Sequence, residues 1–134
     1  MNAAWEAASK GGDVQTIRDF LARGADIDAR DRYGQTALML AAHAGHYAMV
    51  ETLIAQRPDL DVTAKFGLSA LMLAIIARHA EIAHLLATAG ADLSLAGTGA
   101  PGFADKTAYD LAVERGMRDL SAKLRLASQA VGEP

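Results

Sequence analysis

Three glycines in the stretch GTGAPG, at positions 97, 99 and 102, have the spacing of the dinucleotide-binding fingerprint G-x-G-x-x-G. Lys106 and Thr107 follow, in the order that ends a phosphate-binding P-loop. Such glycines bind phosphate only between a parallel strand and the N-terminus of a helix, because the N–H groups and dipole of that helix attract the anion. The elements around this stretch therefore decide whether it binds a nucleotide.

Histidines are the candidate metal ligands. His43 and His46 are three positions apart, but Gly45 should turn the chain between them and take the two rings off a single helix face. His46 and His79 occupy equivalent positions of the repeat described below. Equivalent positions in stacked helices lie about 10 Å apart, too far to share a zinc ion with bonds of about 2 Å. We expect structural histidines and no metal site.

Hydroxyl and carboxylate side chains could in principle support catalysis. No nucleophile among the serines, however, has a base and an orienting group arranged around it in a recognisable motif. Ser69 is better explained as a helix cap, so we expect no enzymatic activity and no cofactor. The residues considered are Ser9, Ser69, Ser94 and Asp110.

Composition and charge exclude several classes of function. The 134 residues carry a net charge of −3 with interspersed signs, so no basic stripe points to nucleic acid. The absence of cysteine excludes disulfides, thiolate catalysis and cysteine-based zinc sites. The longest apolar run, ALMLAIIA, is too short to span a bilayer, and the N-terminus lacks the features of a secretory leader. We expect a soluble, cytoplasmic, monomeric protein of one domain.

A 33-residue repeat organises the chain. GQTALMLA, from Gly34, realigns with GLSALMLA, from Gly67, and the register extends back to the N-terminus. TAYDLA, from Thr107, matches at a shift of 38, so five residues are inserted within AGTGAPGFAD. Each unit predicts two short helices: Thr36, Ser69 and Thr107 as N-caps, and glycine ending the first helix except where Arg78 replaces it.

The stretch GQTALMLAAHAGHYAMVETLIAQRPDLDV resembles the ankyrin repeat pattern G-x-T-P-L-H-x-A-A-x-x-G-H, with alanine for its proline and Met39, Met72 and Asp110 for its histidine. The resemblance implies an all-α solenoid of four helix-turn-helix units with hairpin-like connecting turns, a single domain over residues 1–134. The units are about 1–30 (N-terminal cap), 31–63, 64–96 and 97–130 (C-terminal cap), with the insertion near 97–104.

The repeat changes the interpretation of the glycines. They lie between the turn after one helix pair and the N-cap of the next, not between a strand and a helix. Pro101 would remove an N–H donor from a phosphate-binding loop. Lys106 follows Asp105 rather than the glycine that precedes the lysine of a P-loop. The insertion is then either a flexible finger that touches a partner through Phe103, or a neutral lengthening of a tolerant loop. Small-molecule or nucleotide binding through 97–104 remains the alternative function.

The resemblance also implies a concave surface that binds another protein without catalysis, to scaffold, inhibit or protect it. An aromatic and aliphatic centre with a basic rim is the composition of a protein interface. Against this, the aromatic residue before each turn glycine could merely cover the neighbouring turn, and Ile76 could pack between units. The candidate partner-binding residues are Arg30, Arg32, Tyr33, Gln35, His43, Lys65, Phe66, Leu68, Ile76 and Phe103.

Overall fold

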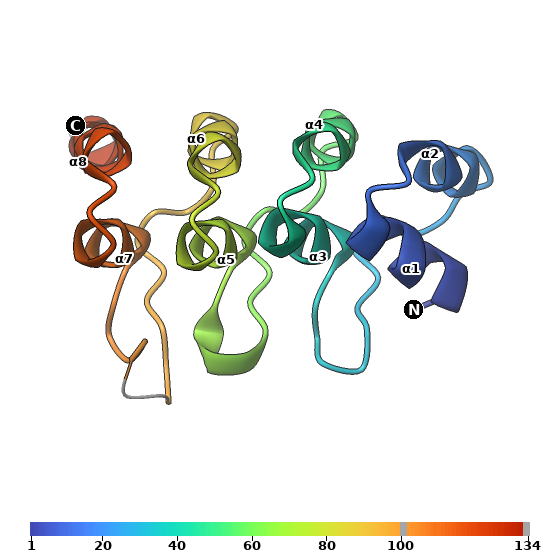
Figure 1. Ribbon diagram of the computed structural model, residues 1–134, viewed down its shortest axis with the longest axis horizontal. Helices are drawn as coiled ribbons and strands as arrows, with labels where there is room; N and C mark the ends of the chain where they lie inside the picture. The colour runs from blue at the N-terminus through green and yellow to red at the C-terminus, as the bar shows by residue number, and fades with distance from the viewer. Residues whose placement is uncertain (100–101, 133–134) are drawn as a thin grey trace.

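The chain folds into four antiparallel helix pairs stacked in a row, as seen in a computed structural model that describes residues 1–99 and 102–132 (Figure 1). The first helices form one layer, the second helices form another, and the connecting turns project on the side away from the second helices. This confirms the all-α solenoid. The helices are α1 (Ala3–Gly11), α2 (Val14–Ala22), α3 (Ala37–Ala44), α4 (Tyr47–Ala55), α5 (Ala70–Ile76), α6 (Ala80–Thr88), α7 (Ala108–Glu114) and α8 (Arg118–Gly132).

Hydroxyl caps start the first helices, as the sequence predicts. The side chain of Thr36 accepts a hydrogen bond from the N–H of Met39, and Ser69 and Thr107 do the same three residues ahead. Asp110 Oδ2 in turn accepts the N–H of Thr107 at 3.0 Å, which completes a capping box. Each cap satisfies an N–H that the first helical turn leaves unpaired.

The core runs along the stack as one apolar cluster between neighbouring units. Trp5 is only 3% exposed and packs edge-to-face on Phe20, at 6.0 Å between ring centroids. Met39 and Met72 are buried as well. Because each helix pair buries its faces only against its neighbours, stacking drives the folding.

Two histidines hydrogen-bond to the preceding unit, and each ring lies against a glycine of that unit. His46 Nε2 donates to the carbonyl of Lys10 at 2.8 Å, and His79 Nε2 donates to the carbonyl of His43 at 3.2 Å. A Cβ on Gly45 would lie 2.7 Å from the His79 ring, and Gly45 has a φ of 86°. Glycine therefore provides both the left-handed turn and the space for the next unit's imidazole.

The interface between the third and fourth units lacks this histidine–glycine contact. Arg78 stands where the other units have glycine, with a φ of 65°, and Met117 stands where the second and third units have His46 and His79. Arg78 Nη1 donates to the carbonyl of Arg115 at 3.0 Å. The bond thus runs from the third unit to the fourth, whereas each histidine bond runs from the later unit to the earlier one.

Aspartates join the turns of successive units. Asp28 Oδ1 accepts the N–H of Asp59 at 3.0 Å, and Asp61 Oδ1 accepts the N–H of Asp92 at 2.7 Å. Ser94 occupies the equivalent position in the next turn, where its hydroxyl donates to Asp92 Oδ1 at 2.6 Å. The hydroxyl of Ser94, followed by its N–H, lowers the pKa of Asp92.

Candidate partner-binding site

The segments that connect one helix pair to the next are here called fingers: residues 23–36, 56–69 and 89–107. Each is closed by a backbone bond at the same place, from Asp31 N to Gln35 O at 2.9 Å, from Ala64 N to Leu68 O at 3.2 Å, and from Gly97 N to Lys106 O at 2.9 Å. These bonds enclose residues 32–34, 65–67 and 98–105. The five inserted residues therefore all lie in the tip of the third finger.

The tip of the first finger presents an aromatic ring to solvent. Tyr33 is 59% exposed, and the Arg32 guanidinium lies 5.0 Å from its ring centroid. Asp31 Oδ1 accepts the N–H groups of both Tyr33 and Gln35 at 2.9 Å. The carboxylate thus fixes the turn from which Tyr33 projects.

The tip of the second finger repeats this pairing of a cation with an aromatic ring. Lys65 Nζ lies 4.8 Å from the centroid of Phe66, which adopts a left-handed φ of 63°. Lys65 is exposed, and Phe66 is half-buried because the third finger covers part of it.

The third finger folds against the second instead of extending into solvent. Thr98 N donates to Phe66 O at 2.7 Å, and the rings of Phe66 and Phe103 lie 5.8 Å apart at 37°. Phe103 is half-buried against Phe66, so it is not the lone, exposed aromatic that the sequence suggested for this finger. A Cβ on Gly97 would lie 2.1 Å from Phe103 O, so this glycine permits a close backbone approach.

The geometry of this finger does not favour a phosphate cradle. The N–H groups of Gly97, Thr98, Asp105 and Lys106 all donate to carbonyl oxygens of the chain. They are therefore not directed at a common anion site, as a phosphate loop requires. Pro101, on which part of the sequence argument depends, lies outside the described residues.

The other predicted residues differ in accessibility. Leu68 is 6% exposed and belongs to the core, so it cannot supply the exposed apolar centre expected of it. Ile76 is half-buried and packs against the core, and Gln35 is half-buried in the first finger. Arg30 and His43 are exposed. Tyr33 alone thus presents a mostly exposed large apolar surface among the predicted residues.

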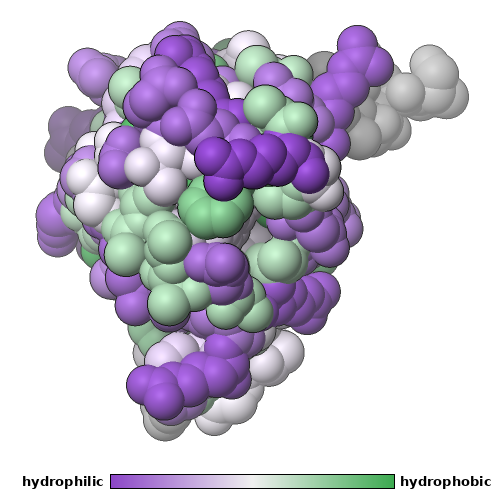
Figure 2. Space-filling view, turned by 90° about the vertical axis from the view of Figure 1, so that its right-hand side faces the viewer, coloured by the Kyte–Doolittle hydropathy of each residue, from purple (hydrophilic) through white to green (hydrophobic). Residues whose placement is uncertain are grey.

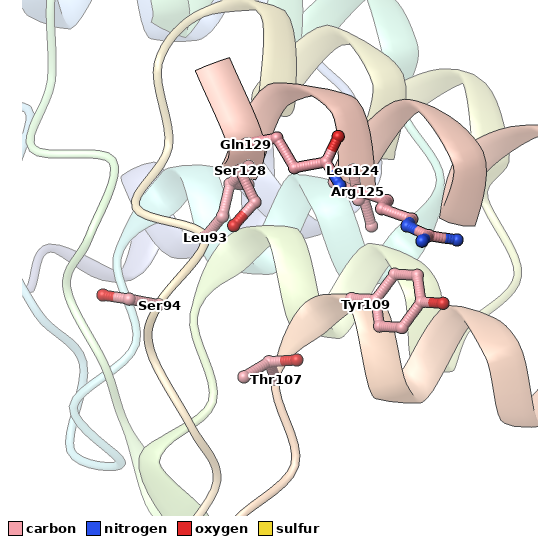
Figure 3. Close-up of a pocket in the computed structure, with 8 residues that line it drawn as sticks. All are labelled: Leu93, Ser94, Thr107, Tyr109, Leu124, Arg125, Ser128 and Gln129. Carbon is pink, nitrogen blue, oxygen red and sulfur yellow. The ribbon is translucent and has the colours of Figure 1, made fainter. Parts of the chain in front are cut away.

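An open hollow of about 450 Å³, which the sequence did not reveal, lies at the C-terminal end of the stack (Figure 3). Tyr109, which lines it from α7, is 38% exposed and nearby Val113 is 51% exposed, whereas Leu71 and Ile75 at the equivalent positions of the third unit are buried. Aligning the repeats could have revealed this surface, because it places Tyr109 and Val113 at positions that are buried in the third unit. The lining residues are Leu93, Ser94, Thr107, Tyr109, Leu124, Arg125, Ser128 and Gln129.

The N-terminal end of the stack has a different surface. Figure 2 views the molecule from this end, where small apolar residues gather between polar ones. In α1, the first helix of the stack, Ala3, Ala4 and Ala7 are exposed. Small side chains here offer little area to a partner, compared with an exposed tyrosine.

The architecture agrees with that of known proteins. Residues 4–96 match the family model described as "Ankyrin repeats (3 copies)". The chain belongs to the ankyrin repeat family. Two putative ankyrin repeat proteins of Rickettsia felis are each 41% identical to it over 46 residues, which are 34% of this chain and 73% and 70% of theirs.

A solved ankyrin-like structure supports the fold. It is a chain in the structure of a predatory endopeptidase from Bdellovibrio bacteriovorus in complex with an immunity protein, with a TM-score of 0.81 and 23% identity. The match covers 92% of this chain and 62% of that chain, so the present chain spans less than two thirds of its length. No helix in the described ranges is long and apolar enough to cross a membrane.

The fourth ankyrin unit lies beyond the family match, although α7 and α8 form a helix pair like the others. The lengthened finger interrupts the 33-residue period before this unit. In addition, Asp110 and Met117 replace residues of the ankyrin pattern. The stack nevertheless continues through α7 and α8.

Proposed function

We propose that this ankyrin repeat protein is a non-catalytic module that binds a partner protein through its finger tips and the adjoining ends of the first helices. The observation that carries the proposal is the exposed Tyr33 beside Arg32 on a turn held by Asp31. Tyrosine and arginine are enriched among residues that dominate interface energies.

The construction of the fingers supports a binding role. The backbone bonds that close the first two tips and the Asp31 bonds hold these tips in defined positions, and the Phe66–Phe103 contact links the second tip to the third finger. A surface that is ordered before binding loses little conformational entropy in the complex. The fingers can therefore contribute contact area at small entropic cost.

The kind of binding is a further part of the proposal. The solved structure that resembles this chain contains an endopeptidase with an immunity protein, which is consistent with ankyrin-type folds occurring in protein complexes. On binding, the protein would inhibit, protect or scaffold its partner.

Affinity capture with a matched variant tests the proposal. The chain and its Arg32→Ala/Tyr33→Ala variant would be immobilised, and proteins retained from the native cell would be identified by mass spectrometry. Tyr109→Ala, at the far end of the stack, is the control. We expect a partner whose Kd rises at least tenfold with the finger variant and stays within twofold for the control. An unchanged Kd with the finger variant would show that this surface is not the binding site.

A further inference from the structure

Three cations at or just before the first two finger tips have no ionic partner in the described part of the chain. Arg30, Arg32 and Lys65 are exposed, and no carboxylate there lies within ion-pair distance of them. By contrast, Lys106 in the third finger donates to Glu114 Oε2 at 2.9 Å. Arg32 and Lys65 are the only charged residues of the tips 32–34 and 65–67, so each of these tips carries a positive charge although the net charge of the chain is −3.

Most carboxylates of the same fingers are already engaged by backbone N–H groups. Asp31, next to the cations, accepts two such bonds through Oδ1, and its Oδ2 is buried. The others so engaged precede the tips and accept bonds within their own turn or from the next finger. They are Asp26, Asp28, Asp59, Asp61 and Asp92.

Cation and aromatic ring alternate along the tips at the repeat spacing. Arg32 lies over Tyr33, and Lys65 lies over Phe66. We infer that these two tips bind an acidic, extended segment of a partner protein, with carboxylates at Arg32 and Lys65 and an apolar side chain between them on Tyr33. The inference rests on the proposed function and specifies the chemistry of the partner.

Repeat geometry predicts the spacing of the carboxylates. Neighbouring units are stacked about 10 Å apart, which places Arg32 and Lys65 at a similar separation. An extended segment in the polyproline II conformation advances about 3.1 Å per residue and makes one turn in three residues, so carboxylates three positions apart lie on the same side and match the two cations. Exposed charge pairs are screened by salt, so the binding should weaken as ionic strength rises.

Synthetic peptides provide a direct test. The first probe is a fluorescein-labelled nonapeptide with two glutamates three positions apart and a phenylalanine between them. A second has the same composition with adjacent glutamates, and a third has lysines in place of glutamates. We expect the first to bind, the second at least fivefold more weakly, and the lysine peptide not to bind. Failure of the first peptide to bind, or equal binding of all three, would overturn the inference.

Charge reversal locates the site. Arg32→Glu/Lys65→Glu should weaken binding of the first peptide at least tenfold. The control is Arg18→Glu/Arg23→Glu, which makes the same charge change at exposed positions in and just after α2. It should alter binding by less than twofold. Equal losses in both variants would indicate only a general attraction of anions and would contradict the inference. Circular dichroism confirms that each variant is folded.

The same variants separate this inference from the proposed function once a partner is identified. A partner that loses affinity with Tyr33→Ala but not with Arg32→Glu/Lys65→Glu would bind at the fingers without acidic chemistry. The inference would then be wrong and the proposed function would stand. A partner insensitive to both changes would contradict both proposals.

Discussion

The ring of Phe103 packs on the ring of Phe66 at 5.8 Å, which joins the inserted segment of the third finger to the tip of the second. Thr98 adds a backbone bond to Phe66 O beside this contact. Phe103 and Thr98 of the third finger therefore both pack against Phe66 of the second finger.

A double-mutant cycle measures this contact. Phe66→Ala and Phe103→Ala should each lower the free energy of unfolding, and the coupling between them should be about 1 kcal/mol, as is usual for aromatic pairs. Urea denaturation of the two single variants and the double variant gives the value. Tyr33→Ala, which removes an exposed ring, is the control and should change the free energy by less than about 0.5 kcal/mol. Strictly additive effects of the two phenylalanines would contradict the contact.

The glycines of the insertion should differ in their tolerance to substitution. Gly97→Ala should lower the free energy of unfolding by about 1–3 kcal/mol, because its Cβ would meet the backbone carbonyl of Phe103. A Cβ added to Gly102 would meet no atom of the described residues within 4 Å, and this glycine has no left-handed φ. Gly102→Ala should therefore change the free energy by less than about 0.5 kcal/mol. Urea midpoints compare the two, and similar losses would indicate that the loop is not closed around Gly97.

The last unit interface can be converted to the arrangement of the others. Arg78→Gly removes a left-handed non-glycine residue but also the bond to Arg115 O, and Met117→His supplies a ring for the space above the new glycine. We expect the free energy of unfolding of the double variant to exceed, by more than about 0.5 kcal/mol, the value predicted by adding the effects of the two single changes. Thermal and urea unfolding of all four proteins measures this coupling. A coupling of zero would show that the two departures from the repeat are independent.

Acid should weaken the structure through two aspartates. Hydrogen bonds from Ser94 lower the pKa of Asp92, and those from Thr16 lower the pKa of Asp13, the N-cap of α2. A lowered pKa in the folded state means that the stabilisation is present above the ordinary pKa of the carboxyl and is lost as pH falls through the folded value. Urea midpoints should therefore fall below about pH 4. They should fall less steeply in Asp13→Asn/Asp92→Asn, and an unchanged slope would contradict the assignment.

The amino-acid sequence alone determined the repeat, the helix caps and the position of the insertion. These depend on a fixed period and on hydrogen bonds between residues a few positions apart, such as Thr36 with Met39. A helix pair that recurs every 33 residues and cannot bury its faces alone must stack, so the fold class followed as well.

Tertiary structure alone decided which of the predicted site residues are accessible. Leu68 and Tyr33 both lie in finger segments, but the unit interfaces bury the first and leave the second in solvent. The packing of Phe103 on Phe66 and the bond from Arg78 to Arg115 join residues 37 positions apart. Such contacts depend on how neighbouring units approach each other in space, which no local pattern in the chain specifies.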